Sequence, residues 1–397
     1  MADPSDHVHH AAAARPAPRG PALLESDSRR IRRPRLRDTY ALATRALERR
    51  PVVTHNATTT TTDSSAVRGM RVAVTGANGF LGTHCVDALR DAGAVPVALV
   101  RHGSDPGALD DREAVILRRV SYDDVDGLRA AMADVDGVIH CAGGGKVRNV
   151  GGFYRANTRT TEAIVAAVLR TGRAMRRFVL VSSIAAHGPC RTSEPADESS
   201  APRPRSHYGK SKLAAESAVA TSPLGRITTI LRPPALYGPG DTRMLPVFRM
   251  ARAGRVPMIA ADGTTMLLAG RDCAEACVAA LDRSPDGIRT YFVDDGEPLS
   301  RRALVAAIGR AVGTKPTVVP LPTGLGRIAS HLVATAARAQ GRAVAFSPDK
   351  MRDLGATEWR FDSRRIREEL GWVPQIARDA GLAATHAAYF ADGSYDA

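Results

Sequence analysis

The stretch TGANGFLG at residues 75–82 limits the possible folds of this chain more than any other segment. The compact apolar segment RVAVT precedes it, and the helical pattern THCVDALRDAG follows at 83–93. In such a loop Gly76 permits a tight turn, Gly79 lets backbone amides approach a pyrophosphate, and Gly82 allows close packing of helix on sheet. The amino terminus of the helix then stabilises the negative charge. The loop therefore predicts a dinucleotide-binding unit.

Short apolar strands alternate with amphipathic helices as far as residue 232. Strands that are apolar on both faces are typical of a parallel sheet covered by helices on both sides. The predicted strands are 71–76, 95–101, 114–120, 136–143, 177–183 and 227–232, and the predicted helices are 83–93, 126–134, 157–172 and a segment around 210–220. We predict an α/β fold with a Rossmann-type, doubly wound parallel sheet.

The pattern loosens after residue 233, where loops rich in Pro and Gly carry shorter helices. These helices are predicted at 245–254, 300–313 and 324–341. This part is predicted to form a smaller, partly interleaved substrate-binding subdomain over the carboxyl edge of the sheet. The predicted domain, 70–390, thus divides into a mainly NAD(P)-binding part, 70–232, and a mainly substrate-binding part, 233–390.

Residues 1–69 differ in character, since they are rich in Ala, Arg, Pro and Thr. A segment of this composition cannot bury enough apolar surface to offset its conformational entropy, so we predict a disordered tail. We expect a chain that begins at Met70 to fold and bind cofactor. The net charge of +14 includes one dense cluster, RRIRRPRLR at 29–37. Because no nucleic-acid-binding motif accompanies it, we interpret it as a solvated tail rather than a specific nucleic-acid site, with weak anion or nucleic-acid contact as the alternative.

The sequence contains no run of about 18 apolar residues and no signal-peptide core, so we predict a cytoplasmic protein without a transmembrane segment. Its five cysteines are scattered and form no CxxC pair; they are Cys85, Cys141, Cys190, Cys273 and Cys277. Cys273 and Cys277 share a helical face, but no second ligand pair with metal-binding spacing accompanies them. We therefore predict that the cysteines are small core residues and that there is no metal site.

The end of the second predicted strand bears on the choice of cofactor. An NAD site usually has Asp or Glu there to hold the ribose 2′-hydroxyl, whereas this strand ends with Arg101. A guanidinium suits a 2′-phosphate, which favours NADP, with NAD as the alternative. In that alternative Arg101 only stacks on the adenine.

Two further segments carry polar side chains suited to chemistry. VLVSSIAAHG at 179–188 places Ser182 and Ser183 at the carboxyl end of a strand, where ligands bind in open α/β sheets. About 25 residues later SHYGKSKLAAE places Tyr208 and Lys212 four residues apart, on one face of a predicted helix. Alone, this pair could equally lie on a solvated helix face.

Together these motifs resemble the extended short-chain dehydrogenases/reductases, also called the NAD-dependent epimerase/dehydratase family. The resemblance runs from Met70 to about Phe390 and is carried by TGANGFLG, HCAGG, SSIAAHG, YGKSK, LRPPALYGPGD, RDCAEACVAAL and LGWVP. It is nearest to the branch with 3β-hydroxysteroid dehydrogenases, dihydroflavonol reductases and bacterial β-keto-lipid reductases.

The resemblance implies roles for individual residues. Tyr208 would exchange a proton with the substrate oxygen, Lys212 would hold the nicotinamide ribose, and Ser183 would hydrogen-bond the substrate, with Ser182 as the alternative because the strand register is open. Further cofactor contacts are implied for Asn78, Phe80, Leu81, Cys141, Ala142 and Pro233, beside Gly76, Gly79, Gly82, Tyr208 and Lys212. Asn157 matches the Asn that opens the following helix in this family.

The chemistry explains the tyrosine–lysine pair. A free phenol has a pKa near 10, too high for ready proton transfer at neutral pH. A neighbouring ammonium and the positive ring of an oxidised nicotinamide favour phenolate. We therefore expect the Lys212 ammonium to lower the pKa of the Tyr208 phenol.

The chain also departs from the family pattern. Ser121 stands where an adenine-contacting Asp is frequent, and Thr160 replaces a Gly in the Asn-x-x-Gly-Thr helix start. Pro234–Ala235 stands where nucleotide-sugar members carry a substrate-binding Asn, and Thr265 replaces their diphosphate-clamping Arg.

These departures favour one function among three. The leading interpretation is an NADP-preferring oxidoreductase that acts on a ketone or secondary alcohol of an apolar small molecule, as a monomer or homodimer. A nucleotide-sugar epimerase or dehydratase is the first alternative. The second is a non-catalytic NADP-sensing regulator, a type of protein that tends to lose the tyrosine retained here.

Overall fold

The computed structural model describes residues 66–110, 112–144, 147–190, 192, 194–339 and 347–395. All of them belong to one compact unit of the chain. The predictions for the tail 1–69 lie outside the described residues, except at its last four positions. No helix in the described ranges is long and apolar enough to cross a membrane.

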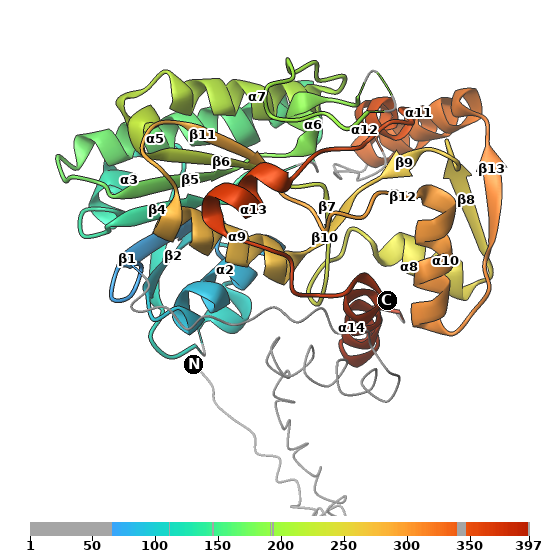
Figure 1. The fold of residues 1–397 in the computed structure, drawn as a ribbon, viewed down its shortest axis with the longest axis horizontal. Coiled ribbons are helices and arrows are strands. Elements are labelled where there is room, and N and C mark those ends of the chain that lie inside the picture. The colour runs from blue at the N-terminus through green and yellow to red at the C-terminus, as the bar shows by residue number, and fades with distance from the viewer. Residues whose placement is uncertain are drawn as a thin grey trace, which may run out of the picture. The chain divides into compact units, whose positions relative to one another are not determined.

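A seven-stranded sheet forms the centre of the molecule, and every neighbouring pair of its strands is parallel (Figure 1). In spatial order its strands are β11 (Arg289–Phe292), β6 (Thr228–Arg232), β5 (Arg177–Val181), β4 (Gly137–His140), β1 (Arg71–Thr75), β2 (Val95–Arg101) and β3 (Ile116–Val120). The order reverses at β1, which pairs with β2 on one side and β4 on the other. This confirms the predicted doubly wound sheet, and ligands bind at such a switch point.

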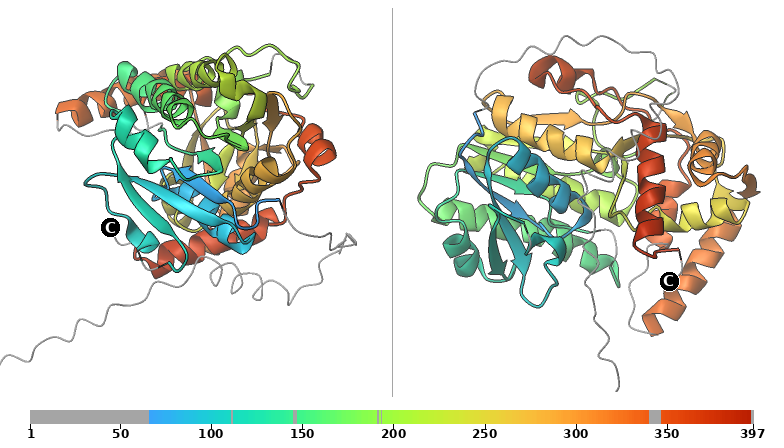
Figure 2. Two further views of the ribbon diagram at one scale, coloured as in Figure 1. Left: turned by 90° about the vertical axis from the view of Figure 1, so that its left-hand side faces the viewer. Right: turned by 90° about the horizontal axis from the view of Figure 1, so that it is seen from below.

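Helices cover both faces of this sheet (Figures 1 and 2). One face carries α2 (Phe80–Asp91), α9 (Gly270–Arg283) and α13 (Arg364–Leu370), and the other carries α3 (Val125–Ala131), α5 (Thr160–Arg170) and α7 (His207–Ala220). Alternate strand residues enter different cores: Val72 and Val74 pack under α2, whereas Ala73 packs under α5. Both faces are therefore apolar, which is why the strands read as continuous hydrophobic runs.

The second part of the chain forms a smaller lobe beside the carboxyl edge of the sheet. Its strand pairs are β7 (Ala235–Tyr237) with β10 (Leu267–Ala269), β8 (Arg255–Ile259) with β13 (Thr317–Leu321), and β9 (Thr264–Thr265) with β12 (Leu299–Ser300). Its helices are α8 (Leu245–Arg252), α10 (Arg301–Val312), α11 (Thr323–Ala339), α12 (Pro348–Leu354) and α14 (Arg378–Ala391). The lobe has its own core, in which the rings of Phe248 and Tyr389 meet edge to face.

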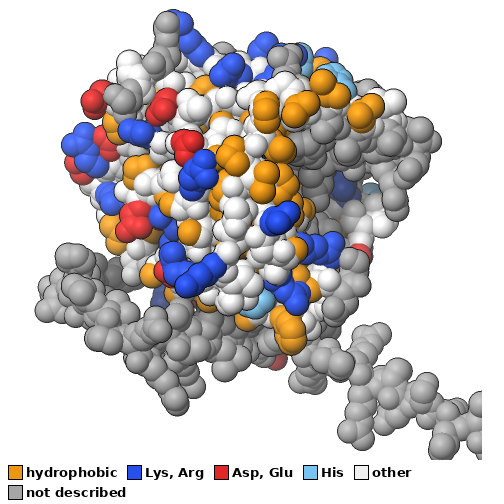
Figure 3. Space-filling model, turned by 90° about the vertical axis from the view of Figure 1, so that its right-hand side faces the viewer, with side chains coloured by type: hydrophobic (Ala, Val, Ile, Leu, Met, Phe, Trp, Pro, Cys, Tyr) orange, Lys and Arg blue, Asp and Glu red, His pale blue; other side chains and the backbone are white. Residues whose placement is uncertain are grey.

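The two parts interleave along the chain. The strand β11 and the helices α9 and α13 follow residue 233, yet they complete the sheet and cover it. On the outer side of the lobe, α11 leaves Leu325, Ile328 and Leu332 exposed; hydrophobic and basic side chains intermingle over this side (Figure 3).

The described chain enters the core before Met70. Val67 is fully buried under the main sheet, and the amide of Gly69 donates to the carbonyl of Gly93 at 2.9 Å. We expect a chain that begins at Met70 to be about 1.5–3 kcal/mol less stable to unfolding than one that begins at Ala66, because it loses this buried side chain. Urea unfolding of the two chains checks this, and equal midpoints and slopes would contradict it.

Candidate active site

The glycine loop between β1 and α2 forms a cradle that side chains would fill. Gly76 has φ +64°, and a Cβ atom there would lie 3.0 Å from Cα of Ala142. A Cβ atom on Gly82 would lie only 2.1 Å from the carbonyl oxygen of Gly76. The first turn of α2 has neither a capping side chain nor an acidic residue. Its free amides and positive dipole end therefore fit the pyrophosphate of a dinucleotide.

The loop is held in place by a residue that the sequence did not point to. The phenol of Tyr122 accepts a hydrogen bond from the amide of Gly76 at 2.9 Å. Burial raises the pKa of Tyr122 to about 12, so the phenol stays protonated at neutral pH. The hydroxyl of the neighbouring Ser121, one of the departures from the family pattern, accepts a hydrogen bond from the amide of Asp123.

A buried hydrogen-bond chain fixes the end of β4 beside the loop. The hydroxyl of Thr75 lies 2.7 Å from Nδ1 of His140 and accepts from the amide of Ala142 at 3.0 Å. Nε2 of His140 lies 2.9 Å from the hydroxyl of Thr161. Burial lowers the pKa of His140 to about 3, so this ring is neutral. Ala142 is thereby held against Gly76, and Cys141 precedes it at the end of β4. That both residues line the cofactor path stays a prediction.

The remaining predicted cofactor residues surround this cradle. Asn78 donates to the carbonyl of Asp105 at 2.9 Å, and the guanidinium of Arg243 lies over the ring of Phe80 at 5.4 Å. Leu81 is half-buried against the main core. Arg101 is exposed at the end of β2.

Ser183 and Tyr208 meet above the carboxyl end of β5. Ser183 caps the short helix α6 (Ile184–His187), which begins there because the Ser183 hydroxyl accepts from the amide of Ala185 at 3.1 Å. Burial raises the pKa of the Tyr208 phenol, and the hydrogen bond from Ser183 partly offsets this. The carbonyl of Pro233 accepts from the amide of Ile184 at 3.0 Å, which fixes this turn to the end of β6.

Ser182, the alternative to Ser183, points elsewhere. Its hydroxyl donates to Oε1 of Glu216 at 2.5 Å, and this carboxylate also receives two hydrogen bonds from Arg232, at 3.0 and 2.7 Å. All three side chains are buried. The structure therefore places Ser183, and not Ser182, beside Tyr208.

Lys212 is buried one helical turn beyond Tyr208, and its ammonium donates to the carbonyl of Val181 at 2.9 Å. Burial lowers its pKa to about 8. After burial, the groups that act on the phenol of Tyr208 are Ser183, Arg243 and Asp353. The Lys212 ammonium is directed at the strand backbone. The assistance of Tyr208 by Lys212 in the cofactor complex stays a prediction.

The side chain of Asn157 joins two segments of the site through hydrogen bonds. It lies in η2 (Arg155–Arg159), a single π-helical turn, and donates to the hydroxyl of Ser211 at 2.9 Å. Its side-chain oxygen accepts from the amide of Gly144 at 3.0 Å. Thr160, which stands in place of the Gly of the family pattern, is the first residue of α5 and donates to the carbonyl of Arg155. Asn157 thus connects the chain after β4 to the helix that carries Tyr208.

Two residues beside Tyr208 were missed because they are distant in sequence. The carboxylate of Asp349, in α12, accepts from the amides of His207 and Tyr208 at 2.7 and 3.1 Å and so caps α7 together with Ser206. The ring of Phe153, in α4 (Val150–Tyr154), lies 6.2 Å from the ring of Tyr208. No local pattern in the sequence marks either contact.

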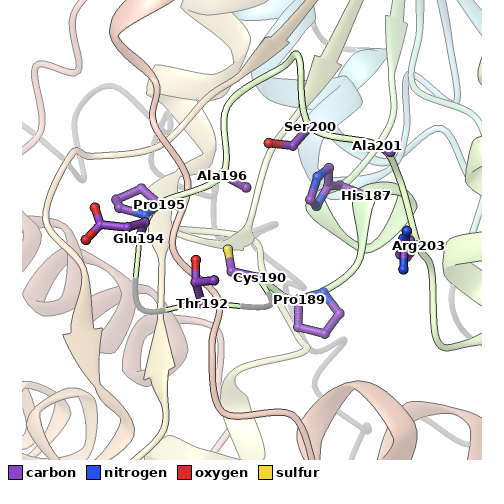
Figure 4. A pocket seen from close by; sticks show the side chains of 10 residues that line it. All are labelled: His187, Pro189, Cys190, Thr192, Glu194, Pro195, Ala196, Ser200, Ala201 and Arg203. Atoms are coloured by element: carbon purple, nitrogen blue, oxygen red, sulfur yellow. The ribbon is translucent and has the colours of Figure 1, made fainter.

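Two cavities flank this constellation. One of about 630 Å³ lies between α4, the start of α7, α11 and α12, and Phe153, His207 and Asp349 are in its wall. The other, of about 330 Å³, is enclosed mainly by the segment between α6 and α7, where His187, Cys190 and Arg203 are in its wall (Figure 4). The larger cavity therefore adjoins Tyr208 through Phe153, whose ring lies beside that of Tyr208, and through His207, which precedes Tyr208 in the chain.

The family model for the NAD dependent epimerase/dehydratase family matches residues 72–292, which cover this sheet and site. The chain belongs to this family. It is 30% identical over 301 residues to a ceramide reductase of Caulobacter vibrioides, covering 75% of this chain and 88% of that protein. It is 31% identical over 337 residues to the 4-hydroxy-2-methyl-3-oxo-4-farnesyl-3,4-dihydroquinoline-1-oxide ketoreductase of Stigmatella aurantiaca. This match covers 79% of this chain and 95% of that protein.

A solved structure confirms the scaffold. The UDP-glucose 4-epimerase of Thermotoga maritima superposes with a TM-score of 0.64 at 20% identity, covering 82% of this chain and all of that one. At this identity the likeness concerns the fold. The chain is thus an oxidoreductase of the extended short-chain dehydrogenase/reductase type, with a nicotinamide dinucleotide as cofactor and a small molecule as substrate.

Proposed function

We propose that this protein transfers hydride between NADP(H) and a ketone or secondary alcohol on a substrate with an apolar body. The observation that carries the proposal is the meeting of Ser183 and Tyr208 at the carboxyl end of β5, with Lys212 one turn away. The printed names of two relatives, a ceramide reductase and a ketoreductase of a farnesyl compound, support the apolar body.

The proposed mechanism assigns the dinucleotide the supply or removal of hydride at the substrate carbon. Tyr208 gives a proton to the carbonyl oxygen during reduction, and its raised pKa keeps this proton on the phenol at neutral pH. Ser183 donates a hydrogen bond to the same oxygen and so stabilises the negative charge that develops there. Lys212, with a pKa of about 8, is mostly protonated at pH 7 and can hold the ribose hydroxyls.

The residues around Arg101 support NADP. The carboxylate of Asp105 accepts from the amide of Gly107 at 2.8 Å and so is engaged within its own turn. No acidic residue occupies positions 101–104. A 2′-phosphate at the end of β2 would therefore face a guanidinium without a competing carboxylate beside it.

We expect Arg101→Asp to reverse the cofactor preference from NADPH to NADH. A charge-assisted hydrogen bond of this kind contributes about 1.5–3 kcal/mol, roughly ten- to a hundredfold in affinity. Fluorescence titration of both cofactors into both proteins measures this, with Arg226→Asp, an exposed arginine before β6 in the other half of the sheet, as a control. Equal or tighter NADH binding by the wild type would mean that Arg101 only stacks on adenine.

The two alternative functions receive less support. In a nucleotide-sugar enzyme, Pro234–Ala235 would leave the sugar without an amide partner, and Thr265 would leave the diphosphate without a cation. Pro234 is buried and Thr265 lies in the β9–β12 pair, so neither position offers a substitute. Retention of Ser183, Tyr208 and Lys212 argues against a non-catalytic regulator.

Turnover of a panel of ketones and nucleotide sugars, followed by NADPH absorbance, tests the proposal. We expect oxidation of NADPH with long-chain or polycyclic ketones and none with UDP- or dTDP-sugars. Conversion of a nucleotide sugar without net NADPH consumption would support the epimerase instead. Tight NADPH binding without turnover of any ketone, alcohol or sugar would favour the regulator.

A further inference from the structure

The cavity of about 630 Å³ beside Tyr208 has a strongly basic rim. Three arginines line it, namely Arg148 before α4, Arg205 before α7 and Arg352 in α12. They reach it from segments up to 204 positions apart in the chain, so the fold brings them to one opening. None of the three guanidiniums forms an ion pair with another residue of the described ranges, although ion pairs occupy many other arginines of this protein.

The wall contains a single acidic residue, Asp349, against three arginines. Its carboxylate is directed at the start of α7, where it accepts from the amides of His207 and Tyr208. Its charge offsets only one of the three arginine charges. Two histidines, His207 and His331, add to the polar wall, and Nδ1 of His207 is buried without a hydrogen-bond partner among the described residues. The opening thus keeps an excess of positive charge, and its side-chain acceptors besides Asp349 belong to the neutral residues Asn149, Thr323 and Ser347.

Part of the wall of the same cavity is apolar. Phe153, Ala334 and Met351 are nearly fully buried, and the more exposed Val147 and Val150 also line the cavity. A small hydrophilic anion would leave this wall in contact with water, and a neutral hydrocarbon would leave the rim unpaired. A ligand with an apolar chain and an anionic group satisfies both parts.

We propose that the substrate is an anionic amphiphile, whose carbonyl lies at Tyr208 and whose phosphate or carboxylate lies among Arg148, Arg205 and Arg352. This inference rests on the proposed reductase function, because it names the class of its substrate. Guanidiniums bind phosphate and carboxylate through paired hydrogen bonds, which gives the rim its selectivity for these groups.

Binding of simple probes tests this independently of turnover. We would titrate decyl phosphate, decanoate, decanol and inorganic phosphate into the NADPH-loaded protein by calorimetry. We expect decyl phosphate and decanoate to bind at least tenfold more tightly than decanol and than inorganic phosphate. Replacing all three arginines by Gln should weaken binding of decyl phosphate about ten- to a hundredfold, since exposed ion pairs contribute roughly two- to fivefold each. It should change decanol binding less than twofold.

Arg226→Gln, an exposed arginine on the distant η3 turn (Pro223–Ile227), is the control and should change neither affinity. Equal binding of decyl phosphate and decanol to the wild type would overturn the proposal, as would an unchanged preference in the triple variant. Inorganic phosphate binding as tightly as decyl phosphate would overturn its amphiphilic part. Tight decyl phosphate binding without reduction of any ketone would instead count against the proposed function alone.

Discussion

Tyr208→Phe is expected to lower turnover by about 10²–10⁴ while NADPH still binds. The substitution removes the hydroxyl that carries the proton in the proposed mechanism, and a positioned proton donor contributes a factor of this order. It leaves the ring in its contact with Phe153 and leaves Asp349 bonded to the backbone amide of Tyr208. Steady-state kinetics and fluorescence titration of NADPH measure the two effects separately.

Three comparison variants separate proton transfer from stability and from cofactor binding. Ser183→Ala should also lower turnover. Ser182→Ala should mainly reduce stability, because the Ser182 hydroxyl donates a hydrogen bond to the buried Glu216. Lys212→Met should weaken NADPH binding as well as turnover. A Tyr208→Phe protein with near wild-type activity would show that another group moves the proton.

Glu216→Leu is expected to cost about 3–5 kcal/mol of the free energy of unfolding. It leaves the guanidinium of Arg232 buried and unpaired, and an uncompensated buried charge is destabilising by this amount. Replacing both partners, Glu216→Leu with Arg232→Met, should recover most of the loss, because a buried ion pair exchanged for apolar side chains is often nearly neutral. Urea unfolding of the two variants measures the difference.

The exposed pair of Arg310 and Asp379 is the matched control. It also forms bidentate hydrogen bonds, but both side chains are more than half exposed. Asp379→Ala should therefore cost less than about 1 kcal/mol. A double variant as unstable as Glu216→Leu alone would mean that Glu216 acts through Ser182 or through packing, and not through the charge of Arg232.

The ion pair also shows why α7 carries its functional residues where it does. Tyr208, Lys212 and Glu216 are spaced at four-residue intervals, so they share one face of the helix. Lys212 and Glu216 are buried, and they anchor this face to the ends of β5 and β6. A rigid anchor of this kind holds Tyr208 at Ser183.

The sequence by itself determined the scaffold and the residue types of the site. The glycine loop needs φ +64° at Gly76 and no side chain at Gly82, and these local requirements can be read without a structure. Strands buried on both faces and helices with a 3.6-residue period likewise carry their own signal. The four-residue spacing of Tyr208 and Lys212 is a property of one helix. For these reasons local patterns predict the fold class, whereas the roles of the serine, the tyrosine and the lysine are predictions from the family resemblance.

Only the tertiary structure decided which of these groups meet. Neighbouring strand residues point in opposite directions, so the choice between Ser182 and Ser183 depended on where β5 ends and α6 begins. The short helices α4 and α6 contain too few residues for a periodic pattern. Asp349 meets Tyr208 across 141 positions, and Arg148, Arg205 and Arg352 converge from three separate segments. Such contacts depend on how the chain returns through space, which no local pattern encodes.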